Sequence, residues 1–171
     1  LGSSTRLISL GAISNPDFDG TSKIYTYDKF EDYEILPEQF ERMNLPSEIL
    51  DDYEASNGKF LNLFNYFHGQ SKYRSQLEAK VGILPDTVEA LGESDELFSL
   101  PAGVDYSAVF VDGCKSWYGT KYFFKELAPH IKKGAQILFQ DYGHYTCFWV
   151  PAFVLTFPEH FELIANVDNT Y

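Results

Sequence analysis

The stretch that most constrains the fold of this chain is the apolar run at residues 108–111, which ends at Asp112. The run reads Ala-Val-Phe-Val without polar alternation, so it predicts a strand buried on both faces inside a parallel sheet. In open α/β sheets, ligands bind outside the carboxyl ends of the strands. We therefore expect Asp112, and Lys115 shortly after it, at an edge of the sheet where a ligand binds.

Strands and helices alternate along the rest of the chain. Residues 22–27, 79–84 and 135–139 predict further strands, with helices between them. This alternation predicts an α/β fold with a Rossmann-like, doubly wound and mostly parallel sheet, covered by helices on both faces. The other expected elements are a strand at residues 161–167 and helices at residues 37–43, 46–53, 59–67, 88–91 and 118–131.

The length of 171 residues fits a single domain, residues 1–171, with a helical insertion at about residues 30–75. The helix at residues 59–67 is rich in large apolar side chains, which suit either a lid over a substrate or packing against the sheet. Lys132, Lys133 and Gly134 are expected to end the helix at residues 118–131, because cations and then glycine favour a helix C-terminus.

The charge balance excludes some classes of partner. The net charge is −12, which disfavours binding to nucleic acid and to anionic membranes. The longest apolar run, at about residues 147–157, is too short to span a bilayer and contains Pro151. As partners we expect a small-molecule substrate, and neither nucleic acid nor a membrane. The sequence does not decide whether the chain forms a homo-oligomer.

Cys114 and Cys147 are the only two cysteines in the sequence. They are too few for a disulfide framework or a structural zinc site, so we expect thiols in a reducing, cytoplasmic compartment, with one disulfide as the alternative. No signal peptide is visible. The chain begins with Leu1 and Gly2 and has no initiator methionine, so the sequence does not decide whether a targeting segment preceded it.

Four carboxylates are expected at the carboxyl ends of successive strands, where α/β folds bind ligands: Asp28, Asp86, Asp112 and Asp141. Asp28 has the position of an acid that accepts hydrogen bonds from ribose hydroxyls, although a solvated loop residue is the alternative. Asp86 faces a cofactor or caps the following helix, and capping is the simpler explanation.

The first residues resemble the end of a glycine loop that opens a helix. Gly2 is followed by Ser3, Ser4 and Thr5, any of which can cap that helix. Such a loop suits a ligand that carries phosphate or carboxylate. An ordinary capped helix explains the same residues.

Two motifs in the second half of the chain resemble those of the class I S-adenosylmethionine-dependent methyltransferases. Residues 111–117, Val-Asp-Gly-Cys-Lys-Ser-Trp, are similar to the Ile-Asp-Gly-Asp-His-Ser-Tyr segment of the macrocin-type sugar O-methyltransferases. Residues 133–142 are similar to their Pro-Gly-Gly-x-Ile-x-x-Asp-Asp-Tyr segment. The chain starts within the glycine motif of that family, so we expect its first strand to be missing here.

The resemblance implies a set of site residues. It places Gly2, Ser3, Ser4 and Asp28 at the cofactor, along with Asp86, Thr87 and Asp112. It also implies a metal site, with Mg²⁺ as the candidate, made by Asp112, Gln140 and Asp141. Gln140 stands where the family has an acid, which removes one charge from that site.

The residues at the position of the catalytic base also differ from those of the family. Cys114 and Lys115 replace an Asp-His pair, so the usual histidine is absent. The spacing Asp-x-x-Lys is instead similar to that of the catechol and caffeoyl-CoA O-methyltransferases. Lys115 is therefore the expected base, acting on a substrate hydroxyl whose pKa a metal lowers. A surface lysine is the alternative for Lys115, and His144 is a second candidate base.

These residues predict an S-adenosylmethionine-dependent O-methyltransferase that acts on a small hydroxylated molecule, with a sugar as one candidate. The first alternative is a methyltransferase-like domain that has lost catalysis, which Cys114 and Gln140 favour. The second is a nicotinamide-dependent oxidoreductase. That enzyme needs Gly-x-Gly-x-x-Gly, and the loop after Gly2 lacks the later glycine.

Overall fold

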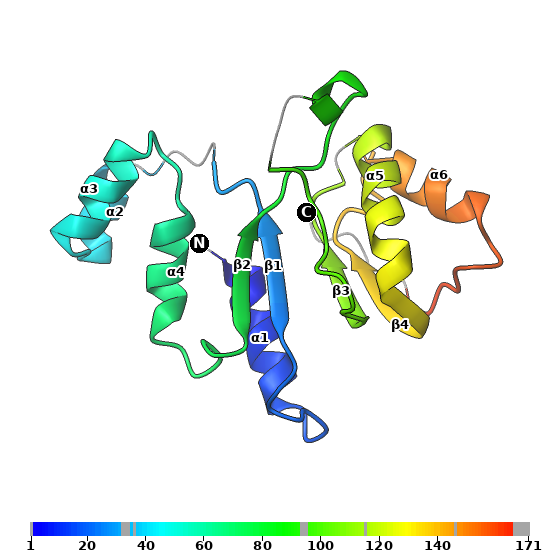
Figure 1. The fold of residues 1–171 in the computed structure, drawn as a ribbon, viewed down its shortest axis with the longest axis horizontal. Coiled ribbons are helices and arrows are strands. Elements are labelled where there is room, and N and C mark those ends of the chain that lie inside the picture. The colour runs from blue at the N-terminus through cyan, green and yellow to red at the C-terminus, as the bar shows by residue number, and fades with distance from the viewer. Residues whose placement is uncertain are drawn as a thin grey trace. The chain divides into compact units, whose positions relative to one another are not determined.

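The computed structural model describes residues 2–31, 35, 37–92, 96–114, 116–145 and 147–165. The chain forms two compact units, Leu1–Val81 and Gly82–Tyr171. Each unit has helices and a pair of parallel strands (Figure 1), so the expected α/β class with parallel pairing is confirmed. Among the described helices, none is both long and apolar enough to cross a bilayer.

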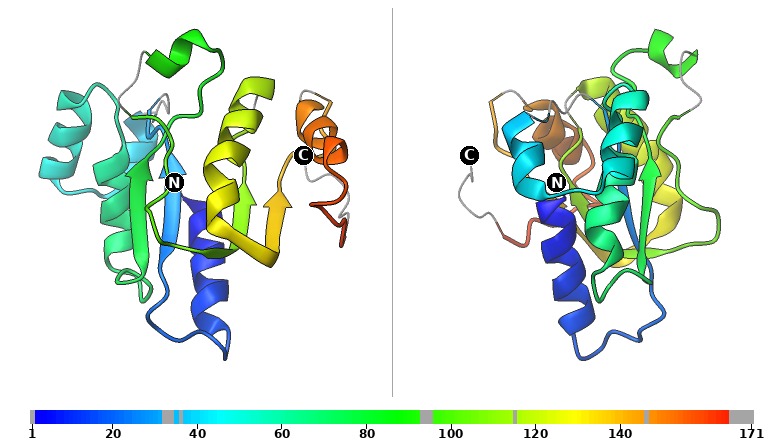
Figure 2. Two further views of the ribbon diagram at one scale, coloured as in Figure 1. Left: turned by 45° about the vertical axis from the view of Figure 1, so that its right-hand side comes forward. Right: turned by 90° about the vertical axis from the view of Figure 1, so that its left-hand side faces the viewer.

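The first unit contains one pair of strands, which lie side by side and point in the same direction in both figures (Figures 1 and 2). Ile24 pairs with Leu77 and Asp28 with Val81. The elements are α1 (Ser3–Ser14), β1 (Ile24–Asp28), α2 (Pro37–Met43), α3 (Ser47–Ala55), α4 (Leu61–Gly69) and β2 (Leu77–Val81).

The core of the first unit is built around Phe30, which is 2% exposed. Its ring meets Phe60 and Phe64 edge to face, with centroids 5.4 and 5.2 Å away. Leu63 and Phe64 of α4 are both buried in this cluster. Helix α4 therefore packs in the core, which is one of the two alternatives expected for residues 59–67.

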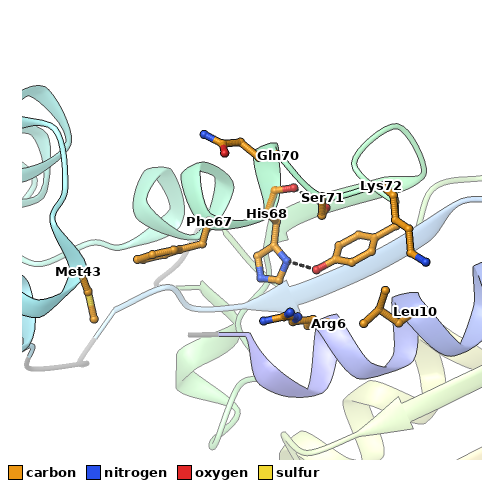
Figure 3. A pocket seen from close by; sticks show the side chains of 9 residues that line it. Arg6, Leu10, Met43, Phe67, His68, Gln70, Ser71 and Lys72 are labelled. Carbon is orange, nitrogen blue, oxygen red and sulfur yellow. Dashed lines mark hydrogen bonds between the residues drawn. The ribbon is translucent and has the colours of Figure 1, made fainter.

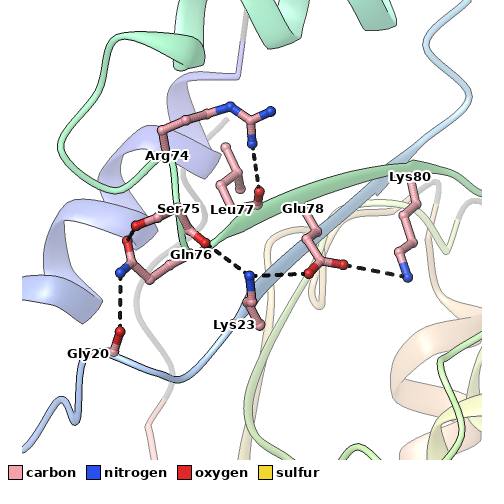
Figure 4. A network of polar contacts seen from close by, with 8 residues as sticks. All are labelled: Gly20, Lys23, Arg74, Ser75, Gln76, Leu77, Glu78 and Lys80. Carbon is pink, nitrogen blue, oxygen red and sulfur yellow. Dashed lines mark hydrogen bonds and ion pairs between the residues drawn. The ribbon is translucent and has the colours of Figure 1, made fainter.

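Polar contacts join the segments that lead into β1 and β2 (Figure 4). The Lys23 ammonium donates to the carbonyl of Ser75 at 3.0 Å and pairs with Glu78 at 3.4 Å. The Gln76 amide donates to the carbonyl of Gly20 at 3.2 Å. Both lysine contacts are exposed, so they orient the strands and add little stability.

The second unit contains the other pair of parallel strands, with α5 beside them (Figure 2). Val109 pairs with Ile137 and Val111 with Phe139. The elements are η1 (Glu89–Gly92), β3 (Tyr106–Val111), α5 (Trp117–Leu127), η2 (Ala128–His130), β4 (Ile131–Phe139) and α6 (Trp149–Thr156).

An aromatic cluster holds α5 against its neighbours. Phe123, Phe124 and Leu127 of α5 are buried. The Phe124 ring stacks on Phe153 of α6, with centroids 4.5 Å apart and planes at 7°. It also contacts Phe139 of β4 at 5.9 Å. Stacked rings of this kind stabilise the packing beyond the area that they bury.

The expected strands at residues 22–27, 108–112 and 135–139 correspond to β1, β3 and β4, and the strand expected at residues 79–84 overlaps β2 only over residues 79–81. The described strands pair two by two, however, whereas a single sheet was expected. The expectation that residues 108–111 are buried on both faces is wrong. Ala108 is exposed, and Leu138 on the adjacent strand is 64% exposed, because no described element of the second unit covers that face.

The helix expected at residues 118–131 ends early. Helix α5 stops at Leu127, and Pro129 lies in the short 3-10 turn that follows. Proline cannot donate to the preceding turn of a helix, so it prevents continuation. Lys132, Lys133 and Gly134 therefore lie in β4, where Gly134 has a φ of +91° at an irregularity of the strand register.

Two further expectations differ from the structure near the carboxyl end. Residues 161–165 are irregular rather than a strand, and residues 166–167 lie outside the described residues. Helix α6 lies in the apolar run at about residues 147–157, where no helix was expected. Pro151 is its third residue, and the first turn of a helix tolerates proline.

Candidate functional site

Asp112 and Asp141 follow the ends of the neighbouring parallel strands β3 and β4. The amide of Gln140 donates to the carbonyl of Val111 at 3.0 Å, which continues the pairing to the last residues of the strands. Asp112 and Asp141 both line one cavity of about 10 Å³, large enough for roughly one water molecule. Gly113, Cys114 and Val150 also line it. The structure thus brings together the two acids that the motifs single out.

The loops beside this cavity are tied to each other. The indole N–H of Trp149 donates to the carbonyl of Cys114 at 2.7 Å. The amide of His144 donates to the carbonyl of Asp141 at 3.1 Å, and the amide of Cys147 donates to that of His144 at 2.9 Å. Both cysteines are buried and form no disulfide, so the expectation of thiols is confirmed.

Helix α5 starts directly after the loop that carries Asp112. Ser116 is its N-cap, and the Ser116 hydroxyl accepts from the amide of Gly119 at 2.9 Å. Leu84 packs against Gly113 and Gly119, where an added Cβ would lie 3.5 Å from it. Lys115, the expected base, lies outside the described residues.

The segment after Leu84 has its own turn. Asp86 and Thr87 are both exposed. The Thr87 hydroxyl accepts from the amide of Ala90 at 3.3 Å. The cap of η1 is therefore Thr87, and the expectation that Asp86 caps a helix there is wrong. Thr87 is three residues before Ala90, which is the spacing at which a capping hydroxyl reaches the amide, whereas Asp86 is one residue farther away.

Of the three residues expected to hold a metal ion, Asp112 and Asp141 line the cavity. In the described part of the chain, no group of three or more His, Cys, Asp or Glu side chains could hold a metal ion. Gln140 is exposed and does not line the cavity. Two carboxylates still fit Mg²⁺, which commonly takes one or two of them and completes its shell with water and substrate oxygens.

His144, the second candidate base, does not line the cavity either. It is half-buried, and its ring lies 4.6 Å from the ring of Tyr145. Tyr145 is 81% exposed. The pair lies at the surface of the loop between β4 and α6.

In the first unit, Gly2 lies at the N-terminus of α1 with a φ of +66°. A Cβ at this position would lie 2.5 Å from both His68 Nε2 and Phe64 Cε2. The helix start therefore packs against α4 only because residue 2 is glycine. Ser3 and Ser4 are exposed residues of the first turn, so the expectation that one of them, or Thr5, caps the helix is wrong.

Asp28 closes β1 and is exposed. One of its carboxylate oxygens accepts from the amide of Phe30 at 3.0 Å, which supports the left-handed φ of +54° at Phe30. The hydroxyls of Thr5 and Thr26 lie 3.2 Å apart and join the first turn of α1 to β1. Because Asp28 is two residues after Thr26, it shares the face of the strand that α1 covers.

A pocket of about 580 Å³ in the first unit was not anticipated from the sequence (Figure 3). Its wall includes Arg6 of α1, His68 of α4 and Tyr73 of the following turn. His68 is 3% exposed, and its Nδ1 lies 2.9 Å from the hydroxyl of Tyr73. Burial and then nearby positive charges, Arg6 among them, hold the pKa of His68 below the ordinary value of 6.5.

The sequence carries only a weak signal for this pocket. A histidine in a helix as aromatic as α4 predicts a buried ring, but not which groups surround it. Comparison with protein-family models, with curated proteins and with solved structures finds no match to this chain.

Proposed function

We propose that the chain is an S-adenosylmethionine-dependent O-methyltransferase domain that acts on a small hydroxylated molecule, with a sugar as one candidate. The observation that carries the proposal is that Asp112 and Asp141 line one cavity at the ends of parallel neighbouring strands. The motif resemblance of residues 111–117 and 133–142 gives these two acids their roles. The proposal includes one doubly wound sheet, with the cofactor at its carboxyl edge.

The cofactor assignments follow the same resemblance. Asp28 is proposed to accept hydrogen bonds from the ribose, because its exposed carboxylate closes β1. The N–H groups of the first turn of α1, at Ser3 and Ser4, have no partner within the helix and suit the carboxylate of the methionine moiety. Asp86 and Thr87 are exposed and are assigned to the side of the adenine.

Methyl transfer from a sulfonium requires a deprotonated hydroxyl that is aligned with the methyl group. Asp112 and Asp141 orient the substrate oxygen, and Mg²⁺ held by them would lower the pKa of that hydroxyl. Lys115 accepts the proton, because it follows Asp112 at the spacing of the related enzymes. His144 is the alternative acceptor.

The second candidate function is a binding domain that has lost catalysis. Two observations favour it: the cavity of about 10 Å³ is small, and Gln140 replaces an acid without lining that cavity. A domain of this kind would bind the cofactor without Mg²⁺ and would lack turnover. The nicotinamide-dependent alternative has no observation of its own in its favour.

Calorimetric titration separates the three functions. S-adenosylmethionine and NAD are each titrated into the full chain, with and without Mg²⁺, and the Asp141→Asn variant is compared with Asp51→Asn on the exposed face of α3. The enzyme hypothesis predicts binding of S-adenosylmethionine alone and a Mg²⁺ binding heat that Asp141→Asn removes and Asp51→Asn keeps. Binding of the cofactor with no Mg²⁺ heat supports the binding domain, and binding of NAD alone contradicts both.

A further inference from the structure

The buried imidazole of His68 uses only one of its two ring nitrogens. Nδ1 contacts the hydroxyl of Tyr73, whereas Nε2 is sealed from solvent and has no hydrogen-bond partner among the described residues. Buried polar atoms are nearly always paired, by protein, water or a ligand, so an unpaired nitrogen needs an explanation. In Figure 3, Nε2 lies on the side of the ring that faces Arg6.

The hydrogen bond to Tyr73 influences which nitrogen of His68 carries the proton. If the Tyr73 hydroxyl donates to Nδ1, the neutral ring carries its proton on Nε2, which is then a donor. The lowered pKa of His68 agrees with a neutral ring. A donor beside a guanidinium is suited to an acceptor that carries negative charge.

The charges around the pocket point the same way. Arg6 and Lys72 line it, no lining residue is acidic, and neither cation has an ion-pair partner among the described residues. The chain as a whole carries a net charge of −12, so a pocket with two cations and no acid differs in charge from the chain as a whole. Its positive potential favours an anion.

The wall also has an apolar part, besides the polar residues Gln70 and Ser71. Leu10, Met43 and Phe67 line the pocket beside the polar groups, and its volume of about 580 Å³ falls within the range of small-molecule sites. An inorganic ion would fill only a small part of that volume. The pocket therefore suits a molecule with one charged end and an apolar body.

We propose that this pocket binds a small organic anion, with a carboxylate or phosphate group that accepts hydrogen bonds from His68 Nε2 and from Arg6. Because Nε2 is buried against the chain at Gly2, the anion reaches it only if the start of α1 shifts, and the exposed Arg6 side chain can turn toward the same anion. Lys72 adds charge at the rim, and the body of the ligand packs on Phe67 and Met43. The inference does not rest on methyl transfer, since none of the residues that line this pocket is assigned to the cofactor or to the reaction.

The test is calorimetric titration of the full chain with 3-phenylpropionate and phenyl phosphate, using neutral 3-phenylpropanamide and inorganic phosphate as comparisons. We expect both organic anions to bind at least about tenfold more tightly than either comparison, because charge and apolar contact are both needed. The tighter of the two identifies the charged group. Equal binding of the amide, or no binding of either organic anion at millimolar concentration, overturns the proposal.

Substitutions at residues that line the pocket test whether the organic anion binds there. Arg6 is exposed, so Arg6→Gln should fold and should weaken binding about tenfold or more, the effect of losing one charge-assisted hydrogen bond. Lys125→Gln on α5 makes the same charge change in the other unit and should leave the affinity unchanged. The ring ¹⁵N signals of His68 should shift on binding. Unchanged affinity in folded Arg6→Gln, or no shift at His68, contradicts the assignment.

Discussion

The indole N–H of Trp149 donates to the main-chain carbonyl of Cys114 across 2.7 Å. This contact joins the first turn of α6 to the loop that carries Asp112, and Cys114 is buried. The position of the loop that carries Asp112 therefore depends on α6, the helix that follows the loop with Asp141.

Replacing Trp149 by phenylalanine removes that donor from a part-buried carbonyl. We expect Trp149→Phe to lower the free energy of unfolding by about 0.5–1.5 kcal/mol, the usual net contribution of one hydrogen bond. Trp117→Phe is the matched control, because Trp117 is 47% exposed. Urea denaturation of both variants measures the difference. Equal stability of the two would show that the indole hydrogen bond adds nothing.

Gly2 permits the close approach of α1 to α4. Gly2→Ala should destabilise the first unit by about 1–3 kcal/mol beyond the strain of a positive φ, because the added methyl overlaps His68 and Phe64. Gly20→Ala is the control, with a φ of +74° and no atom within 4 Å of the added Cβ. Thermal unfolding compares the two variants. Identical losses would mean that only backbone strain matters at Gly2.

The lowered pKa of His68 makes stability depend on pH. Between its folded-state pKa and the unfolded value of 6.5, the unfolded chain binds more protons, so the free energy of unfolding falls as pH falls through that window. The stabilisation is complete above about pH 6.5. We expect urea midpoints of wild type to decrease more between pH 7.5 and pH 5 than those of His68→Gln. Parallel pH profiles for the two proteins would contradict this linkage.

Lys115 is expected to act on the substrate hydroxyl and not on the cofactor. Once a substrate is found, Lys115→Ala should lower kcat about 10²-fold or more, the usual contribution of a general base, with little change in cofactor affinity. Lys121→Ala on the exposed part of α5 is the control and should keep both values. If Lys115→Ala weakens cofactor binding as much as turnover, Lys115 is a binding residue.

The strands could be predicted from the sequence because apolar runs that end at a carboxylate carry a local signal. The positions of β1 and β3 follow such runs, and in β4 the acid Asp141 comes one residue later, after Gln140. The end of α5 was predicted too late from the cations Lys132 and Lys133, because Pro129 ends the helix before them. Helix α6 was not predicted, because the apolar run was considered only as a membrane span, and Pro151 in its first turn is compatible with a helix.

The two sites differ in how much the sequence could predict. Asp112 and Asp141 share a cavity because parallel pairing alone brings the ends of β3 and β4 to one edge. The pocket beside His68 depends on how α1 packs on α4, which a close approach at Gly2 decides. No spacing along the chain encodes that contact, so only the folded structure reveals it.

The most direct test of the proposed function is the affinity for S-adenosylmethionine of the full chain and of its Asp28→Ala variant, measured by calorimetry. Asp19→Ala is the matched control, an exposed carboxylate in the same unit that accepts from the amides of Thr21 and Ser22. We predict that the cofactor binds, that Asp28→Ala weakens binding by about 1–3 kcal/mol through the loss of hydrogen bonds to the ribose, and that Asp19→Ala does not. Unchanged affinity in a folded Asp28→Ala variant, or no binding by the wild-type chain, would contradict the proposal.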